Sequence, residues 1–148
     1  MLASTRHQLR SFIELAFSHI RIGARRSSGL SSWLHFGENA TSTVGPSLYA
    51  GTAGIALALN DYGTWAGEDW AIDLARESIC QSLESVGQVH EDLRLGFYSG
   101  WSGVAYAAHH IAHSLSDKHL KQRAIELFRA VSDQVPSHEF AVIGGSAG

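Results

Sequence analysis

A short glycine pattern occurs three times along this 148-residue chain. Each copy has two glycines separated by two residues, and the pairs are Gly51 and Gly54, Gly100 and Gly103, and Gly145 and Gly148. The first glycines of successive pairs are 49 and then 45 residues apart. A repeat of roughly 20–50 residues is typical of solenoids, propellers and helical arrays. The third copy ends where the sequence ends, so we expect the chain to stop within a repeated architecture.

The residues around the glycines make this repeat more specific than two glycines alone. A bulky residue lies two positions before each first glycine: Tyr49, Tyr98 and Ile143. A small residue directly precedes each second glycine. Glycine allows another segment to approach the backbone closely, and small residues in a first helical turn allow tight packing. The pattern therefore predicts equivalent helix starts, whose amide ends all point the same way.

Helical hydrophobic patterns of two kinds follow the glycine motifs. Residues 55–59 are apolar on all sides, as expected of a buried helix, and the same type returns after Gly103 with residues 104–108, 111 and 112. Residues 68–86 and 117–135 instead carry apolar side chains on one face, and Asp117 is placed to cap the second of them. A buried helix followed by a half-exposed helix is the unit of a double-layered helical barrel. The predicted fold class is therefore all-α.

The segment before the first repeat has a different composition. Residues 5–22 place apolar side chains along one stripe, which predicts an amphipathic helix. Residues 23–47 are rich in Ser, Thr and Gly and predict a long loop, pinned to the core by aromatic residues such as Trp33. We therefore expect one domain with two parts. Residues 1–47 form the helix and loop, and residues 48–148 form three repeats, the last of them truncated.

Charge and cysteine content exclude several classes of function. The net charge of −3 offers no basic surface for nucleic acid or an anionic membrane. No stretch approaches the roughly 20 apolar residues of a membrane-spanning helix, and charged side chains interrupt the N-terminus where a secretory signal is apolar. Cys80 is the only cysteine, so an internal disulfide is excluded. These features favour a cytoplasmic protein.

The three motifs together resemble those of the lanthionine synthetase C-like (LanC-like) family. The matching segments are residues 48–56, 96–107 and 142–148, so the resemblance covers the chain from about residue 46 to its end. It implies an α/α toroid of about seven inner and seven outer helices, of which this sequence holds about three hairpins. It also implies zinc-dependent cyclisation of a dehydrated precursor peptide, in which a cysteine thiolate forms a thioether (lanthionine) bridge.

Two departures from the family pattern concern the chemistry. The family's zinc ligands are two cysteines and a histidine in the C-terminal half, and those motifs are not in this sequence. Cys80 lies outside any glycine motif and receives no ligand role, so we expect zinc only in a longer parent protein. The family commonly carries a proton-transferring aspartate where this chain has Ala141, which cannot act as acid or base. We assign no catalytic residue and expect this chain alone to be inactive.

Two further groups of residues are candidates for binding. His90 precedes the second motif and Trp101 lies within it. Both are candidate substrate-facing residues, with a solvated loop and simple packing as the respective alternatives. His109 and His113 are one helical turn apart, a spacing that suits a metal, although histidine also suits the last turn of a helix. No further ligands accompany them, so we predict no metal site.

The sequence leaves three functions open. The resemblance implies modification of a precursor peptide, whereas Ala141 favours a non-catalytic, peptide-binding toroid. An α/α-barrel glycosidase or sugar epimerase also stacks helical hairpins, but it needs paired carboxylates on its inner helices. Asp61 is an acid at the end of one predicted inner helix.

Overall fold

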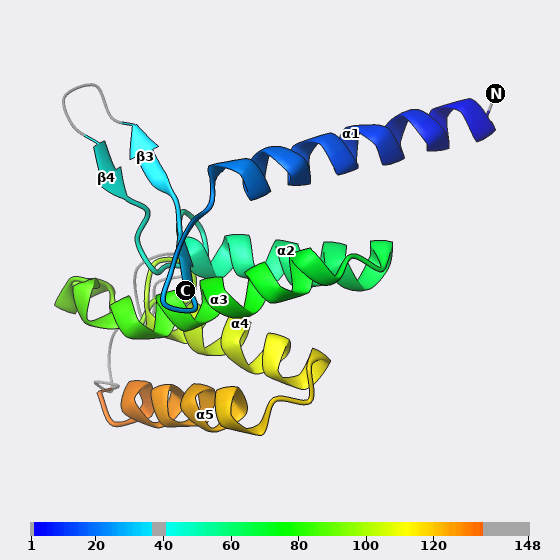
Figure 1. Ribbon diagram of the computed structural model, residues 1–148. Helices are drawn as coiled ribbons and strands as arrows, with labels where there is room; N and C mark the ends of the chain where they lie inside the picture. The colour runs from blue at the N-terminus through cyan, green and yellow to red at the C-terminus, as the bar shows by residue number, and fades with distance from the viewer. Residues whose placement is uncertain (1, 37–40, 135–148) are drawn as a thin grey trace.

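Five α-helices form most of the part of the chain that the computed structural model describes, residues 2–36 and 41–134. The helices are α1 (Leu2–Gly23), α2 (Thr52–Ala66), α3 (Asp69–Ser85), α4 (Trp101–Ser114) and α5 (Lys118–Ser132), with short 3-10 turns η1 (Val86–Gln88) and η2 (Glu91–Leu93) before α4 (Figure 1). The all-α class is confirmed. The third glycine motif and Ala141 lie outside the described residues.

Each of the two described glycine motifs begins a helix that pairs with the next helix as a hairpin. α2 ends at Gly67, whose φ of 72° is left-handed and whose N–H donates to the carbonyl of Gly63 at 2.9 Å. This is a common helix ending, and it turns the chain directly into α3. α5 begins at Asp117, whose side chain accepts from the N–H of Leu120 at 3.0 Å. The predicted N-cap is therefore confirmed.

α2 and α4 lie side by side and run in the same direction (Figure 1). Residues that hold the same place in the two repeats meet at both ends. At the motif end, the N–H of Tyr49 donates to the carbonyl of Tyr98 at 2.9 Å. At the other end, Nε2 of His110 lies 3.3 Å from Oδ1 of Asp61. Both pairs are separated by 49 positions, so the repeat in the sequence is a repeat in space.

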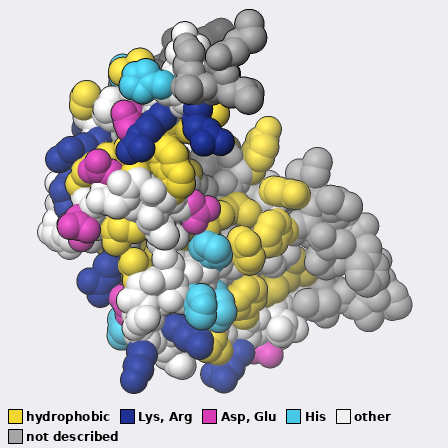
Figure 2. Space-filling model, turned by 90° about the vertical axis from the view of Figure 1, so that its right-hand side faces the viewer, with side chains coloured by type: hydrophobic (Ala, Val, Ile, Leu, Met, Phe, Trp, Pro, Cys, Tyr) yellow, Lys and Arg dark blue, Asp and Glu magenta, His cyan; other side chains and the backbone are white. Residues whose placement is uncertain are grey.

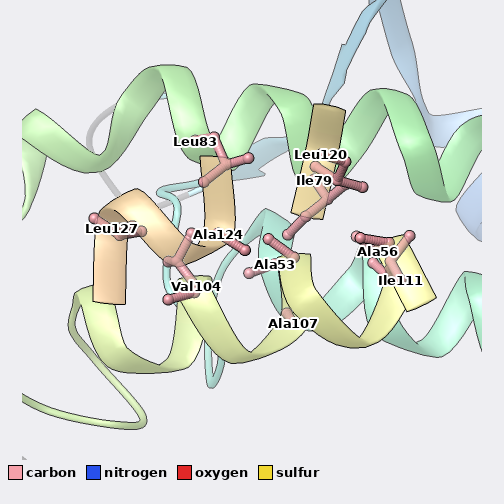
Figure 3. Close-up of a cluster of buried hydrophobic side chains, with 13 residues drawn as sticks. Ala53, Ala56, Ile79, Leu83, Val104, Ala107, Ile111, Leu120, Ala124 and Leu127 are labelled. Carbon is pink, nitrogen blue, oxygen red and sulfur yellow. The ribbon is translucent and has the colours of Figure 1, made fainter. Parts of the chain in front are cut away.

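Small side chains allow the helices of the two hairpins to pack closely (Figure 3). The buried cluster contains Ala53, Ala56, Ile79, Leu83, Val104, Ala105, Ala107, Ala108, Ile111, Ala112, Leu120, Ala124 and Leu127. α3 also buries Ser78 and Ser82. Ser82 Oγ lies 2.6 Å from Oγ1 of Thr52, so buried hydroxyls at this α2–α3 contact are satisfied within the protein. The half-exposed pattern predicted for α3 is present. Its buried face includes serines as well as apolar residues, so this face is wider than the apolar residues alone indicate.

The segment predicted as a long loop contains two short antiparallel hairpins instead. β1 (Arg25–Ser27) pairs with β2 (Leu30–Ser32), and β3 (Leu34–Phe36) pairs with β4 (Thr41–Thr43). Ser28 and Gly29 join β1 to β2 and both have positive φ, 52° and 77°, as a tight two-residue hairpin turn requires. Strands of three residues are too short to show an alternating pattern. The loop prediction is wrong for this reason, and the Ser-Gly pair was the available signal.

α1 packs on the rest of the molecule over only part of its length (Figure 1). Its packed residues are Ile13, Phe17 and Ile20. The ring of Phe17 stacks on that of Tyr62 at 4.1 Å, and the indole of the buried Trp33 donates to the carbonyl of Ile20 at 2.8 Å. Phe12, on the same predicted stripe, is 69% exposed. None of the described helices has the length and apolar content that crossing a membrane demands.

Candidate functional site

The two described glycine motifs have the same backbone geometry. The N–H of Thr52 donates to the carbonyl of Gly45, and the N–H of Trp101 donates to the carbonyl of Arg94, both at 2.8 Å. The two donors are 49 positions apart, and so are the two acceptors. In both described repeats the first turn of the predicted inner helix, α2 or α4, is therefore tied to the loop seven residues earlier.

Close approach of that loop, rather than an unusual backbone angle, explains the glycines. Gly51 and Gly100 are N-cap residues with ordinary extended backbones, φ −131° and −115°. A Cβ on Gly54 would collide with the carbonyl oxygen of Leu48. A Cβ on Gly103 would collide with the equivalent carbonyl of Phe97. Backbone atoms cannot rotate away as a side chain can, so the motif holds each helix start in place. Gly145 and Gly148 lie outside the described residues.

A continuous series of rings lies beside the motif loops and along α4. We call it the aromatic row, and its members are Tyr49, Tyr98, Phe97, Tyr106 and His110. Successive ring centroids are 6.5, 5.4, 5.4 and 6.2 Å apart. Three of the rings are exposed tyrosines, in contrast to the buried alanines on the opposite side of α4. The row therefore forms an exposed aromatic surface with polar hydroxyl groups, and this surface begins at the motifs of both repeats.

The aromatic row ends at a polar group that joins the two repeats. Oδ1 of Asp61 accepts a hydrogen bond from Nδ2 of Asn60 at 3.3 Å and lies 3.3 Å from Nε2 of His110. Asn60 is buried, and its Oδ1 has no partner among the described residues. Asp61 is exposed, so its carboxylate is open to solvent. Figure 2 shows histidine side chains beside hydrophobic side chains on one face of the molecule.

Trp101, predicted as a possible substrate-facing residue, is held by the core. Its indole N–H donates to the carbonyl of Val86 at 2.8 Å, and its ring packs against the buried cluster. The guanidinium of Arg94 covers the ring at 5.1 Å from the centroid. The indole therefore has the geometry of the packing alternative, and it is not part of the aromatic row.

His90 lies in an exposed turn before the second motif. Its Nδ1 accepts from the N–H of Asp92 at 3.4 Å and so caps η2. This is the geometry of the solvated-loop alternative. The residues that sequence reasoning missed are the tyrosines. For Tyr49 and Tyr98 the signal in the sequence is the bulky residue two positions before each first glycine, which marks the motif but does not by itself indicate an exposed surface.

The described residues do not fit the family's zinc site. Within the part of the chain that the structure describes, no three His, Cys, Asp or Glu side chains gather as metal ligands. Nε2 of His110 lies 3.3 Å from Oδ1 of Asp61, and His109 and His113 belong to no group of three possible ligands among the described residues. Cys80 lies on α3, where burial raises the pKa of its thiol and so opposes the thiolate that zinc requires.

The two helical hairpins, with a glycine motif at the start of α2 and of α4, define an all-α helical-repeat protein. A family model described as lanthionine synthetase C-like protein matches residues 42–148. The chain belongs to this family. The match covers both described motifs and all four helices that follow them, whereas α1 lies before it. No individual curated protein matches the chain.

Proposed function

We propose that this chain supplies scaffold and peptide-binding surface to a LanC-like protein that cyclises a dehydrated precursor peptide. In that reaction the sulfur of a peptide cysteine bonds to the β-carbon of a dehydroalanine or dehydrobutyrine. The thiol proton is given up, and the α-carbon gains a proton. The described residues do not fit zinc, and Ala141 cannot transfer a proton. In this proposal the described stretch of chain binds and orients the peptide, and residues outside it activate the thiol.

The observation that carries the proposal is the aromatic row. Tyrosine rings combine a broad apolar face with a polar hydroxyl, and they are enriched where proteins bind other chains. Successive ring centroids along the row lie 5.4 to 6.5 Å apart. An extended peptide rises about 3.3–3.6 Å per residue, so each step along the row corresponds to about two peptide residues. The row is thus long enough to hold a short peptide segment, which is what ring closure between nearby residues needs.

Two alternatives make different use of the same fold. A non-catalytic peptide-binding toroid is favoured by Ala141, and it predicts binding without loss of the peptide's thiol. A carbohydrate enzyme of the α/α-barrel class needs two facing carboxylates. α2 and α4 contain one carboxylate between them, Asp61, so the described inner helices do not support that class.

Peptide binding tests the proposal directly. We expect the 148-residue chain to raise the fluorescence anisotropy of a labelled peptide that contains one cysteine and one dehydroalanine. Tyr106→Leu should weaken binding about fivefold, because it removes a ring and leaves an apolar side chain. Phe128→Leu on α5 is the matched control, since Phe128 and Tyr106 are 38% and 42% exposed. Absence of binding, or equal weakening by both variants, would contradict the proposal.

Thiol consumption separates the cyclase from the binding alternative. The peptide and the chain are incubated with zinc, and the remaining free thiol is measured by alkylation and mass spectrometry. We expect the free thiol to persist with this chain alone. Binding that persists in a full-length parent without any thiol loss would favour the non-catalytic toroid.

A further inference from the structure

We propose that the aromatic row selects a peptide segment with a lysine or arginine side chain directed at Asp61. This inference rests on the proposed peptide binding and names the chemical class of peptide. Three features of the described residues support it: the charge of the inner helices, the ring faces that carry no cation, and the partners of the Asp61 carboxylate.

The basic side chains of the inner helices are all histidines, and they lie on α4. α2 and α4 contain no lysine or arginine, and Asp61 is their single carboxylate. Arg76 of α3 and Arg123 of α5 are paired with acids at 2.8 and 2.7 Å, and Arg94, in the loop before the second motif, lies over Trp101. Arg10 of α1 reaches α2 at Trp65, but its charge is paired with Glu14 at 2.8 Å. A peptide cation on the row therefore meets attraction from Asp61 and no repulsion from a lysine or arginine of α2 or α4.

The rings of the row carry no cation of their own. Elsewhere in the described residues three tryptophans are each covered by a guanidinium, at 4.7 to 5.6 Å from the ring centroid. No described lysine or arginine lies over Tyr49, Tyr98 or Tyr106 in this way. Their electron-rich faces are therefore available to a cation from outside the protein.

The carboxylate of Asp61 is held ready for such a cation. Asn60 donates to Oδ1, and His110 lies at hydrogen-bonding distance from the same oxygen, so the group is oriented from both inner helices. Oδ2 has no partner among the described residues, and the side chain is 63% exposed. Oδ1 thus orients the carboxylate of Asp61, and Oδ2 is available to bind the cation of the peptide.

Three labelled peptides test the inference, identical except for lysine, norleucine or glutamate at one position. In low salt we expect the lysine peptide to bind about tenfold more tightly than the glutamate peptide, with norleucine between them. The difference should shrink at 0.5 M salt because exposed charges are screened. Asp61→Asn should abolish the preference, whereas the control Asp92→Asn, at a carboxylate 85% exposed in the η2 turn, should leave it intact.

The outcomes separate this inference from the proposed function. Equal binding of the three peptides, or tighter binding of the glutamate peptide, overturns the charge preference and leaves peptide binding standing. A preference that survives Asp61→Asn also overturns it, provided that circular dichroism shows the variant folded. Failure of all three peptides to bind overturns the proposed function and this inference together.

Discussion

Leu48 of the first repeat packs directly over Gly103 of the second. A Cβ on Gly103 would lie 2.8 Å from the Cβ of Leu48 and would also collide with the carbonyl of Phe97. We expect Gly103→Ala to lower the free energy of unfolding by about 2 kcal/mol or more, because the loop and the neighbouring repeat must both shift. Urea denaturation measures this change. Gly87→Ala is the control, since a Cβ there meets nothing within 4 Å, and an equal loss in both variants would contradict the explanation.

The N-cap residue of α5, Asp117, makes the free energy of unfolding depend on pH. The hydrogen bond from the N–H of Leu120, with the nearby Arg76, holds the pKa of Asp117 below its ordinary value. A lowered pKa in the folded state adds stability above the unfolded value of about 4. That stability is lost as the pH falls from there through the folded pKa. Asp117→Ala should cost about 1 kcal/mol at neutral pH.

Asp117→Asn isolates the charge from the cap, because asparagine caps helices about as well as aspartate. We expect this variant to keep most of the neutral-pH stability and to lose part of the acid dependence between pH 5 and 2. Chemical denaturation at a series of pH values gives both quantities. An unchanged pH dependence in Asp117→Asn would show that other carboxylates, such as Glu77 with its lowered pKa, control acid unfolding.

The exposed part of α1 predicts self-association. Leu9 and Phe12 are exposed, and large exposed apolar surfaces promote association. We expect Leu9→Ser with Phe12→Ser to shift the chain toward monomer in sedimentation velocity, with little change in thermal stability. Phe17→Ser, which breaks the stack on Tyr62, should instead lower stability by roughly 3 kcal/mol. Self-association that is unchanged in the double variant would show that a surface other than Leu9 and Phe12 mediates it.

The turn between β1 and β2 depends on a glycine for its backbone angle. Gly29 has φ of 77° with nothing near its Cβ position, so strain and not collision opposes a side chain. Gly29→Val should therefore cost about 1–2 kcal/mol. Gly45→Val, where the Cβ position is also open but φ is not left-handed, is the matched comparison by urea denaturation. Similar losses at both positions would refute the angle argument.

The helical scaffold could be predicted from the sequence because glycines mark the repeat at positions where a larger residue does not fit. The 49-residue step between Gly51 and Gly100 is the register of α2 against α4, and the cap at Asp117 is a local signal. What was missed depends on contacts between distant segments. Periodicity placed Phe12 on the apolar face of α1 but could not show whether anything covers it. Tyr106 belongs to the aromatic row because α4 lies beside the loops of both motifs, and the sequence does not show this contact between distant segments.

The main-chain bond from Tyr49 to Tyr98 also bears on the order of folding. Each hairpin is local, because two residues separate α2 from α3, and such units form early. The contacts between equivalent residues of the two repeats bridge 49 positions, so they pay the entropy of closing a long loop. We expect the first motif loop to settle only after α4 has formed. Until then the alanine-lined side of α2 is uncovered, and we expect the docking of the two hairpins to be slower than the formation of either one.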